Sequence, residues 1–312
     1  MSSILKKMPI NKKNKIRFTS ALLFLVIAGI VIACSQTKDT KDIFAKENLV
    51  AWCIVPFDTE NRSPEERASM LNKLGITSLA WDWREKHLPI FEREINVLQK
   101  SNIELKSVWF YVTVDNGKII NNGNETIVKI LEKTGTKTDL WVSLPEDNFE
   151  GMTDEEKVKK GVELVNHIYD RAKAIGCTVS LYNHGGWSGM PENMVKIIEA
   201  SGHKSIGIIY NFHHAHLQLS DYEKNIKIMM PYLNTVNLNG MEKGGEKILP
   251  LGEGNLELDM MNTLQKLGFQ GAIGILGHKD DEDVKISLQR NLDGMKKLLT
   301  QMDNDAAVKT YN

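Results

Sequence analysis

Long apolar runs and cysteines are both scarce in this sequence. The apolar run near the start covers only the thirteen residues 21–33, whereas a membrane-spanning helix needs about 20. With 42% hydrophobic and 25% charged residues, the composition is ordinary for a globular protein, which excludes a collagen, a disordered tail and a polytopic membrane protein. Cys53 and Cys177 lie inside apolar runs, and nothing in their spacing requires a disulfide, so we interpret them as two buried thiols.

Acidic residues are missing from the first part of the chain. Residues 1–33 carry six lysines and arginines and no acid. Removing these six charges from the overall net charge of −1 leaves −7 on residues 34–312. A chain of that sign is poorly suited to neutralising a phosphate backbone, which excludes nucleic acid as a partner.

The basic start, the apolar run and a cysteine follow one another in the order of a secretory signal. The run ends in Val-Ile-Ala-Cys34, which resembles the lipobox of bacterial lipoproteins. The resemblance implies a signal peptide over residues 1–33, a lipid on Cys34 and a polar tether over residues 34–47. We therefore expect an exported protein whose lipid anchors it to a membrane of the bacterial cell envelope, in the periplasm or at the outer membrane. A simple N-terminal anchor with an unrelated cysteine is the alternative.

From about residue 48 onward, short apolar runs alternate with longer amphipathic stretches. Most runs are continuously apolar, as parallel strands covered on both faces are. The expected strands are 49–57, 76–83, 105–112, 139–144, 178–183, 206–211, 235–239 and 271–276. The helices between them have readable ends, such as the capping box at Ser63–Glu66 and the stop at Gly75.

Eight strand–helix units predict a single-domain (β/α)8 TIM barrel over residues 48–302, followed by a C-terminal tail over 303–312. A doubly wound open sheet is the alternative. We prefer the barrel because there are eight units and because no glycine-rich dinucleotide fingerprint follows any strand.

Polar residues stand at the ends of the expected strands, where active sites of this fold gather. Several of them form motifs, namely Tyr182-Asn183-His184, Asn211 with His214, Asn237 with Asn239, and Leu-Pro-Leu-Gly-Glu-Gly at 249–254. These motifs resemble those of the xylose-isomerase-like TIM barrels, also described as sugar phosphate isomerases/epimerases.

The resemblance implies a divalent metal held by Glu, Asp, His and Glu after the fifth to eighth strands. Those positions fall here on Tyr182, on Asn211, on about Asn237, and near Leu276 or Gly277. Only the additional histidine, three residues beyond the Asp, is matched, by His214. The chain is therefore interpreted as a divergent member without the usual acidic ligands, and hard ions such as Mg²⁺ and Mn²⁺ prefer those carboxylates.

Histidines remain at the same strand ends. His184, His214 and His278 would project from different strands, and with Asn211 they could form a three-histidine site for a divalent transition metal. The alternative is a metal-free pocket in which the imidazoles are hydrogen-bonding groups, so the cofactor stays open.

Aromatic and amide side chains at the strand ends favour a small carbohydrate ligand, because sugar faces stack on aromatic rings and amides satisfy hydroxyl groups. We expect a single cavity, open at one mouth of the barrel, to be surrounded by Tyr182, Asn183, His184, Asn211, His214 and Asn237. The candidate substrate-binding residues are Trp109, Tyr111, Tyr182, Asn183, Trp187, Asn211, Asn237 and Asn239.

Two acids at strand ends, Asp82 and Glu146, are the candidate general acid and base, with His184 or His214 polarising a carbonyl oxygen. The hypothesis is an envelope-anchored carbohydrate enzyme of the isomerase/epimerase type, which moves a proton next to a carbonyl. A non-catalytic glycan-binding lipoprotein is the alternative. A phosphodiester-cleaving relative is disfavoured by the charge and by the missing acidic metal site.

Overall fold

The computed structural model describes residues 42–114 and 117–312. The expected signal peptide, the lipidation site Cys34 and most of the expected tether lie outside the described residues. None of the helices in the described ranges is long and apolar enough to span a bilayer.

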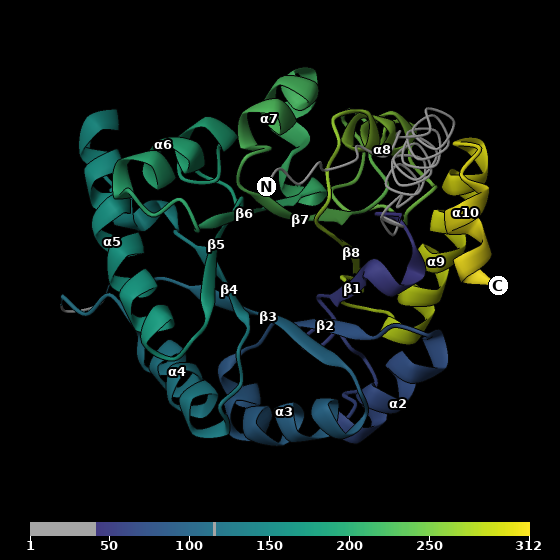
Figure 1. The fold of residues 1–312 in the computed structure, drawn as a ribbon, viewed down its shortest axis with the longest axis horizontal. Helices are drawn as coiled ribbons and strands as arrows, with labels where there is room; N and C mark the ends of the chain where they lie inside the picture. The colour runs from purple at the N-terminus through teal and green to yellow at the C-terminus, as the bar shows by residue number, and fades with distance from the viewer. Residues whose placement is uncertain (1–41, 115–116) are drawn as a thin grey trace, which may run out of the picture. The chain divides into compact units, whose positions relative to one another are not determined.

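Eight parallel strands close into a barrel in the order β1 to β8, which confirms the (β/α)8 prediction (Figure 1). Each strand pairs with the next one in sequence, and β8 pairs with β1. The strands are β1 (Leu49–Trp52), β2 (Ser78–Trp81), β3 (Glu104–Tyr111), β4 (Asp139–Ser143), β5 (Thr178–Tyr182), β6 (Gly207–Asn211), β7 (Leu233–Leu238) and β8 (Ala272–Leu276).

Helices surround the barrel (Figure 1). They are α2 (Pro64–Leu74), α3 (Phe91–Lys100), α4 (Asn122–Thr134), α5 (Asp154–Ala174), α6 (Pro191–Ser201), α7 (Tyr222–Met229), α8 (Glu257–Lys266), α9 (Val284–Gln301) and α10 (Asp305–Val308). The local signals act as expected at α2, where Ser63 and Glu66 form the capping box and Gly75 ends the helix in the left-handed region at φ 71°.

Two apolar cores hold this arrangement together. The larger one packs the outer faces of the strands against the helices. The smaller one fills the barrel interior and includes Trp52, Trp141, Tyr182 and Leu276, from four different strands. Because successive residues of a strand point to opposite faces, the inward position of Tyr182 turns Asn183 the other way.

The folded unit is longer than predicted at both ends. Phe44 is completely buried, and Asp42 accepts a hydrogen bond from Asn304 at 2.7 Å. The Tyr311 hydroxyl donates to the Phe44 carbonyl oxygen at 2.7 Å. The two segments placed outside the barrel, 42–47 and 303–312, therefore pack against each other, and the boundaries move to Asp42 and Asn312.

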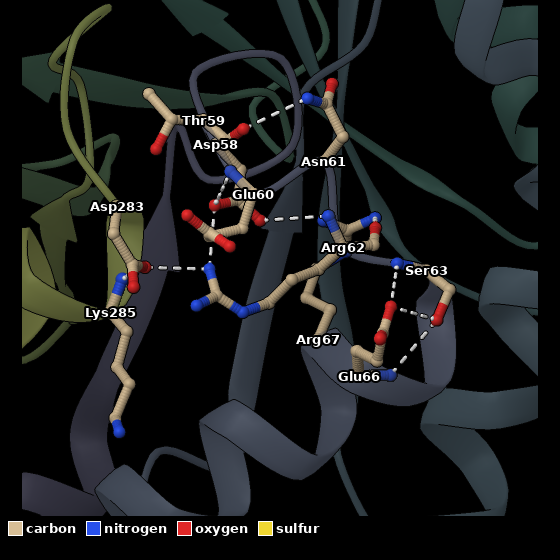
Figure 2. Close-up of polar contacts among 10 residues, drawn as sticks. All are labelled: Asp58, Thr59, Glu60, Asn61, Arg62, Ser63, Glu66, Arg67, Asp283 and Lys285. Atoms are coloured by element: carbon tan, nitrogen blue, oxygen red, sulfur yellow. Dashed lines mark hydrogen bonds and ion pairs between the residues drawn. The ribbon is translucent and has the colours of Figure 1, made fainter.

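An ion-pair bridge joins the loop after β1 to the start of α9 (Figure 2). Arg62 Nη1 lies 2.7 Å from Asp58 Oδ1 and 2.8 Å from Asp283 Oδ1. Asp58 also accepts from the backbone amides of Glu60 and Arg62. Asp58, which directly follows the expected strand 49–57, is thus used to build the loop where the first and last units of the barrel meet.

Candidate functional site

A cavity of about 360 Å³ opens at the carboxyl-terminal mouth of the barrel. Because the strands are parallel, their carboxyl ends share this rim, and the loops that follow them supply the walls. The lining residues are Trp52, Cys53, Phe57, Asp82, Arg84, Trp109, Tyr182, His184, Gly185, His213, His214, Lys247 and His278.

Asp82 is the one carboxylate among these lining residues, and it follows β2 directly. Its Oδ1 accepts a hydrogen bond from the Val55 amide at 3.3 Å, whereas its buried Oδ2 has no partner. Burial raises the pKa of Asp82 from 3.8 to about 7, although the nearby Arg84 opposes the rise. A carboxylate with a free oxygen and a pKa near neutrality suits a general base.

Four histidines form one side of the cavity. The ring centroids of His184 and His214 lie 4.6 Å apart, and those of His213 and His214 lie 4.0 Å apart. Burial lowers the pKa of His184 to about 4, of His214 to about 2 and of His278 to about 4, and it also lowers the pKa of the deeply buried His213. The imidazoles are therefore neutral at neutral pH, and each presents one N–H donor and one acceptor nitrogen.

Aromatic rings and two cations complete the wall. Trp52 from β1, Phe57 from the loop after it and Trp109 from β3 line the cavity. The Arg84 guanidinium carbon lies 5.4 Å from the Phe57 ring centroid and 5.5 Å from that of Trp109. Lys247 comes from the loop between β7 and α8.

Cys53 turns the backbone sharply at the end of β1. Its φ of 57° is in the left-handed region, which costs a non-glycine residue about 1 kcal/mol or more. Burial, with the charge of Asp82, raises the pKa of the Cys53 thiol well above its usual value. The thiol therefore stays protonated in the cavity wall.

The predicted amide residues are in the barrel but do not line the cavity. Asn183 bonds both to the carbonyl oxygen and to the amide of Asn211, at 3.1 and 2.7 Å, and so joins β5 to β6. Asn211 Nδ2 donates to the Tyr182 hydroxyl at 2.6 Å. Asn239 donates to the Gly240 carbonyl oxygen, and Asn237 is fully buried with no partner for either side-chain atom. The expectation that Asn183, Asn211 and Asn237 surround the cavity is corrected, because none of them is among the lining residues.

Glu146 is likewise absent from the lining residues and lies in the turn after β4. Its Oε2 accepts from the Trp187 amide at 2.7 Å, and its Oε1 pairs with Lys157 at 3.1 Å. Trp187 packs against Phe149. Glu146 and Trp187 thus hold the loop after β5 in place. Tyr111 lies beside the lining residues, with its ring centroid 5.3 Å from that of Trp109.

The residues at the four positions where the resemblance implies metal ligands do not fit a hard divalent ion. They supply a phenol at Tyr182, two amides at Asn211 and Asn237, and an apolar side chain at Leu276, with no carboxylate. The side chains of Tyr182 and Asn211 are hydrogen-bonded to each other. Within the two described ranges, moreover, no three His, Cys, Asp or Glu side chains are grouped to hold a metal ion, and that includes His184, His214 and His278.

A larger cavity of about 820 Å³ lies at the opposite, amino-terminal mouth of the barrel. Its lining includes Asp139, whose carboxylate accepts from Thr178 at 2.7 Å and whose pKa is raised to about 6 by burial. It has no histidine among its lining residues. We place the candidate site at the carboxyl-terminal mouth, where the free carboxylate, the imidazoles and the cations converge.

Sequence reasoning found about half of the lining and missed the rest. Four of the residues predicted from the strand ends, Asp82, His184, His214 and His278, are among the lining residues. The pair Asp82-x-Arg84 at one strand end was a usable signal for the arginine. Nothing in the sequence pointed to Lys247, because it lies in the middle of a long loop.

The comparisons agree with this architecture. The family model described as xylose isomerase-like TIM barrel matches residues 38–298, and no curated protein matches the chain. Among solved structures, the 3-keto-D-glucoside 4-epimerase YcjR from E. coli has a TM-score of 0.62 at 15% identity, covering 82% of this chain and 100% of that one.

Two further structures are similar in fold. D-psicose 3-epimerase with D-tagatose, from Clostridium cellulolyticum, has a TM-score of 0.59 at 14% identity, with 80% and 99% of the two chains covered. The probable 3-DHS dehydratase AsbF from Bacillus anthracis has a TM-score of 0.55 at 14% identity, with 77% and 97% covered. With its closed barrel and a family match over most of its length, the chain belongs to the xylose isomerase-like TIM barrel family.

Proposed function

We propose that this protein is a sugar isomerase- or epimerase-type enzyme that moves a proton at a carbon next to a carbonyl. The observation that carries the proposal is Asp82, a lining residue of the cavity whose buried carboxyl group has one oxygen without a partner and a pKa of about 7. The epimerase activities named for two structures of the same fold support the same reaction class.

The reaction would use the side chains of this chain alone. Asp82 Oδ2 removes the proton from the carbon, and the electron pair moves into a carbon–carbon double bond while the carbonyl oxygen becomes negative. A neutral imidazole of His184 or His214, through its N–H, stabilises that oxygen. The proton of the hydroxyl group on the first carbon passes to the negative oxygen, and the first carbon becomes the new carbonyl carbon. At the same time the protonated Asp82 returns its proton to the former carbonyl carbon on the same face, which completes an aldose–ketose exchange.

The aromatic walls give this chemistry a carbohydrate-shaped site. Trp52, Phe57 and Trp109 offer flat faces to the C–H groups of a sugar. A cavity of about 360 Å³ is at the small end of the range for ligand sites, which suits a single sugar unit.

Solvent exchange tests the proposal. The purified protein is incubated in D₂O with a panel of ketoses, aldoses and 3-keto-glycosides, and NMR records deuterium at the carbon next to the carbonyl. Exchange that disappears in Asp82→Asn supports the proposal. Absence of exchange across the panel contradicts it.

A glycan-binding lipoprotein without catalysis is the second candidate. It is favoured by the absence of a carboxylate at the four ligand positions, which leaves Tyr182, Asn211, Asn237 and Leu276 there. Sugar binding without proton exchange would select this function.

The proposed location is the bacterial cell envelope, with a lipid on Cys34 holding the enzyme to a membrane. The lipobox-like sequence before Cys34 supports it. Labelling with a radioactive fatty acid in cells tests it: wild-type protein is expected to carry the label, and Cys34→Ser is expected to lose it.

A further inference from the structure

Two cations at the cavity, Arg84 and Lys247, make no ion pair within the described residues. The charged pairs found there join other side chains, and none includes either residue. Both line the cavity, in which Asp82 is the one acid. Even with Asp82 ionised, the lining therefore has one positive charge in excess.

Arg84 is held in place without a carboxylate. Its guanidinium lies near the faces of Phe57 and Trp109, and its Nη1 donates to the Trp83 carbonyl oxygen at 2.8 Å. Its backbone amide donates to His87 Nδ1 at 2.9 Å. Among the described residues its Nε and Nη2 donors have no hydrogen-bond acceptor, and two such donors in a rigid plane match the two oxygens of a carboxylate.

We propose that Arg84 and Lys247 together bind an anionic group of the substrate, and that the substrate is a sugar acid whose carboxylate faces these two residues. This inference rests on the proposed function for the identity of the ligand as a sugar. With Asp82 ionised, as the proposed base must be, a monoanionic carboxylate balances the single excess charge, whereas a phosphate dianion would leave the lining and ligand with a net negative charge.

Anion binding by Arg84 and Lys247 also explains why the cavity has two cations beside the proposed general base. Arg84 and Lys247 are both exposed at the mouth, so they meet a ligand before the deeper groups do. They would orient the distant end of the sugar and leave the carbonyl end to Asp82 and the imidazoles.

The test compares three ligands of one carbon skeleton: D-fructose, D-fructuronate and D-fructose 6-phosphate. Titration calorimetry at low salt measures binding to the purified full-length protein. Fructuronate is expected to bind at least about tenfold more tightly than fructose, as a charge-assisted hydrogen bond allows, and more tightly than the phosphate. Raising the salt is expected to weaken the complexes of the two anionic ligands and to leave that of fructose unchanged.

Variants assign the effect to the two residues. Lys247→Gln and Arg84→Gln are each expected to lose about tenfold in fructuronate affinity and much less in fructose affinity. Lys243→Gln is the matched control, because Lys243 is exposed in the same loop and is not a lining residue. Lys247→Gln keeps the test decisive if Arg84→Gln unfolds, because the Lys247 side chain makes no hydrogen bond within the described residues.

The inference is overturned if fructose binds as tightly as fructuronate, if fructose 6-phosphate binds best, or if Lys247→Gln weakens all three ligands equally. Binding is scored separately from proton exchange. Tight fructuronate binding without proton exchange contradicts the proposed function but supports anion binding by Arg84 and Lys247. Proton exchange on neutral sugars alone supports the proposed function and overturns the inference about anion binding.

Discussion

Asp82→Asn is expected to make the protein less active and more stable at the same time. The substitution keeps the shape of the side chain and the acceptor for the Val55 amide, but it removes the charge and the base. In the wild-type protein the carboxylate is only 2% exposed, and its burial raises the pKa to about 7.

The magnitude follows from that pKa. A rise from 3.8 to about 7 is equivalent to ~4 kcal/mol, at about 1.36 kcal/mol for each pKa unit. The folded state holds this proton more tightly than the unfolded state does. The free energy of unfolding therefore falls as the pH rises from about 4 to about 7, and it stays low above that pH.

The side-chain amide of the Asp82→Asn variant does not titrate, so the free energy of unfolding of the variant does not fall in this way as the pH rises. The new amide replaces an oxygen that has no partner, and an unsatisfied amide costs about 1–2 kcal/mol. We expect Asp82→Asn to be about 2–3 kcal/mol more stable than wild type at pH 8, and no more stable at pH 4. Proton exchange should fall by at least about a hundredfold, as removal of a general base does.

Urea unfolding of both proteins at pH 8 and pH 4 measures the first effect, and exchange in D₂O measures the second. Asp147→Asn is the control, because Asp147 is exposed in the turn after β4 and does not line the cavity. Its stability should change by less than about 0.5 kcal/mol. Equal stability of Asp82→Asn and wild type at pH 8, or unchanged exchange, would refute the reasoning about Asp82.

Three further predictions concern the frame of the site. Arg62→Met should lower the free energy of unfolding by about 2 kcal/mol at pH 7. Because the Arg62 hydrogen bond lowers the pKa of Asp283, this loss should become smaller as the pH falls through that pKa. Equal shifts of the urea midpoint at pH 7 and pH 3 would contradict this prediction. Gly274→Ala would place Cβ 1.7 Å from Asn237 Oδ1. The free energy of unfolding, measured by thermal unfolding, should therefore fall by about 1–3 kcal/mol. An unchanged Tm would argue against the close approach of Gly274 and Asn237. Tyr311→Phe removes a hydrogen bond to the N-terminal segment and should cost about 1 kcal/mol in urea unfolding, and no loss would mean that the C-terminal segment adds no stability.

The barrel could be predicted from the sequence because its signals are local. Each strand is a short apolar run, and helix ends carry a cap that acts within a few residues, as Ser63 and Glu66 do. The count of eight units then selects the closed barrel. The pairing of residues 42–47 with 303–312 escaped prediction because it joins the two ends of the folded unit across a sequence separation of 262 residues.

The site was predictable only where strand periodicity determines the direction of a side chain. Tyr182 points inward and lines the cavity, so its neighbour Asn183 points away, and the rule of alternation could have separated the two. The alternation extends to Asn183, whose backbone amide still donates to Ile209 of β6, but it does not hold in the longer loops. Glu146 follows Pro145 into a turn and holds the next loop, whereas Lys247 reaches the cavity from the long loop after β7.

The distribution of acids around the mouth also bears on the stereochemistry of the proposed reaction. With no carboxylate at the four positions where the resemblance implies metal ligands, Asp82 on the β2 side is the one acid among the lining residues. A single base gives and takes its proton on one face of the intermediate, so it favours transfer between neighbouring carbons over inversion at one carbon. Inversion would need a second proton donor on the opposite face, and the neutral thiol of Cys53, the phenol of Tyr182 and the imidazoles are the groups that could supply it. Whether the product is an isomer or an epimer therefore depends on which of these groups faces Asp82 across the bound sugar.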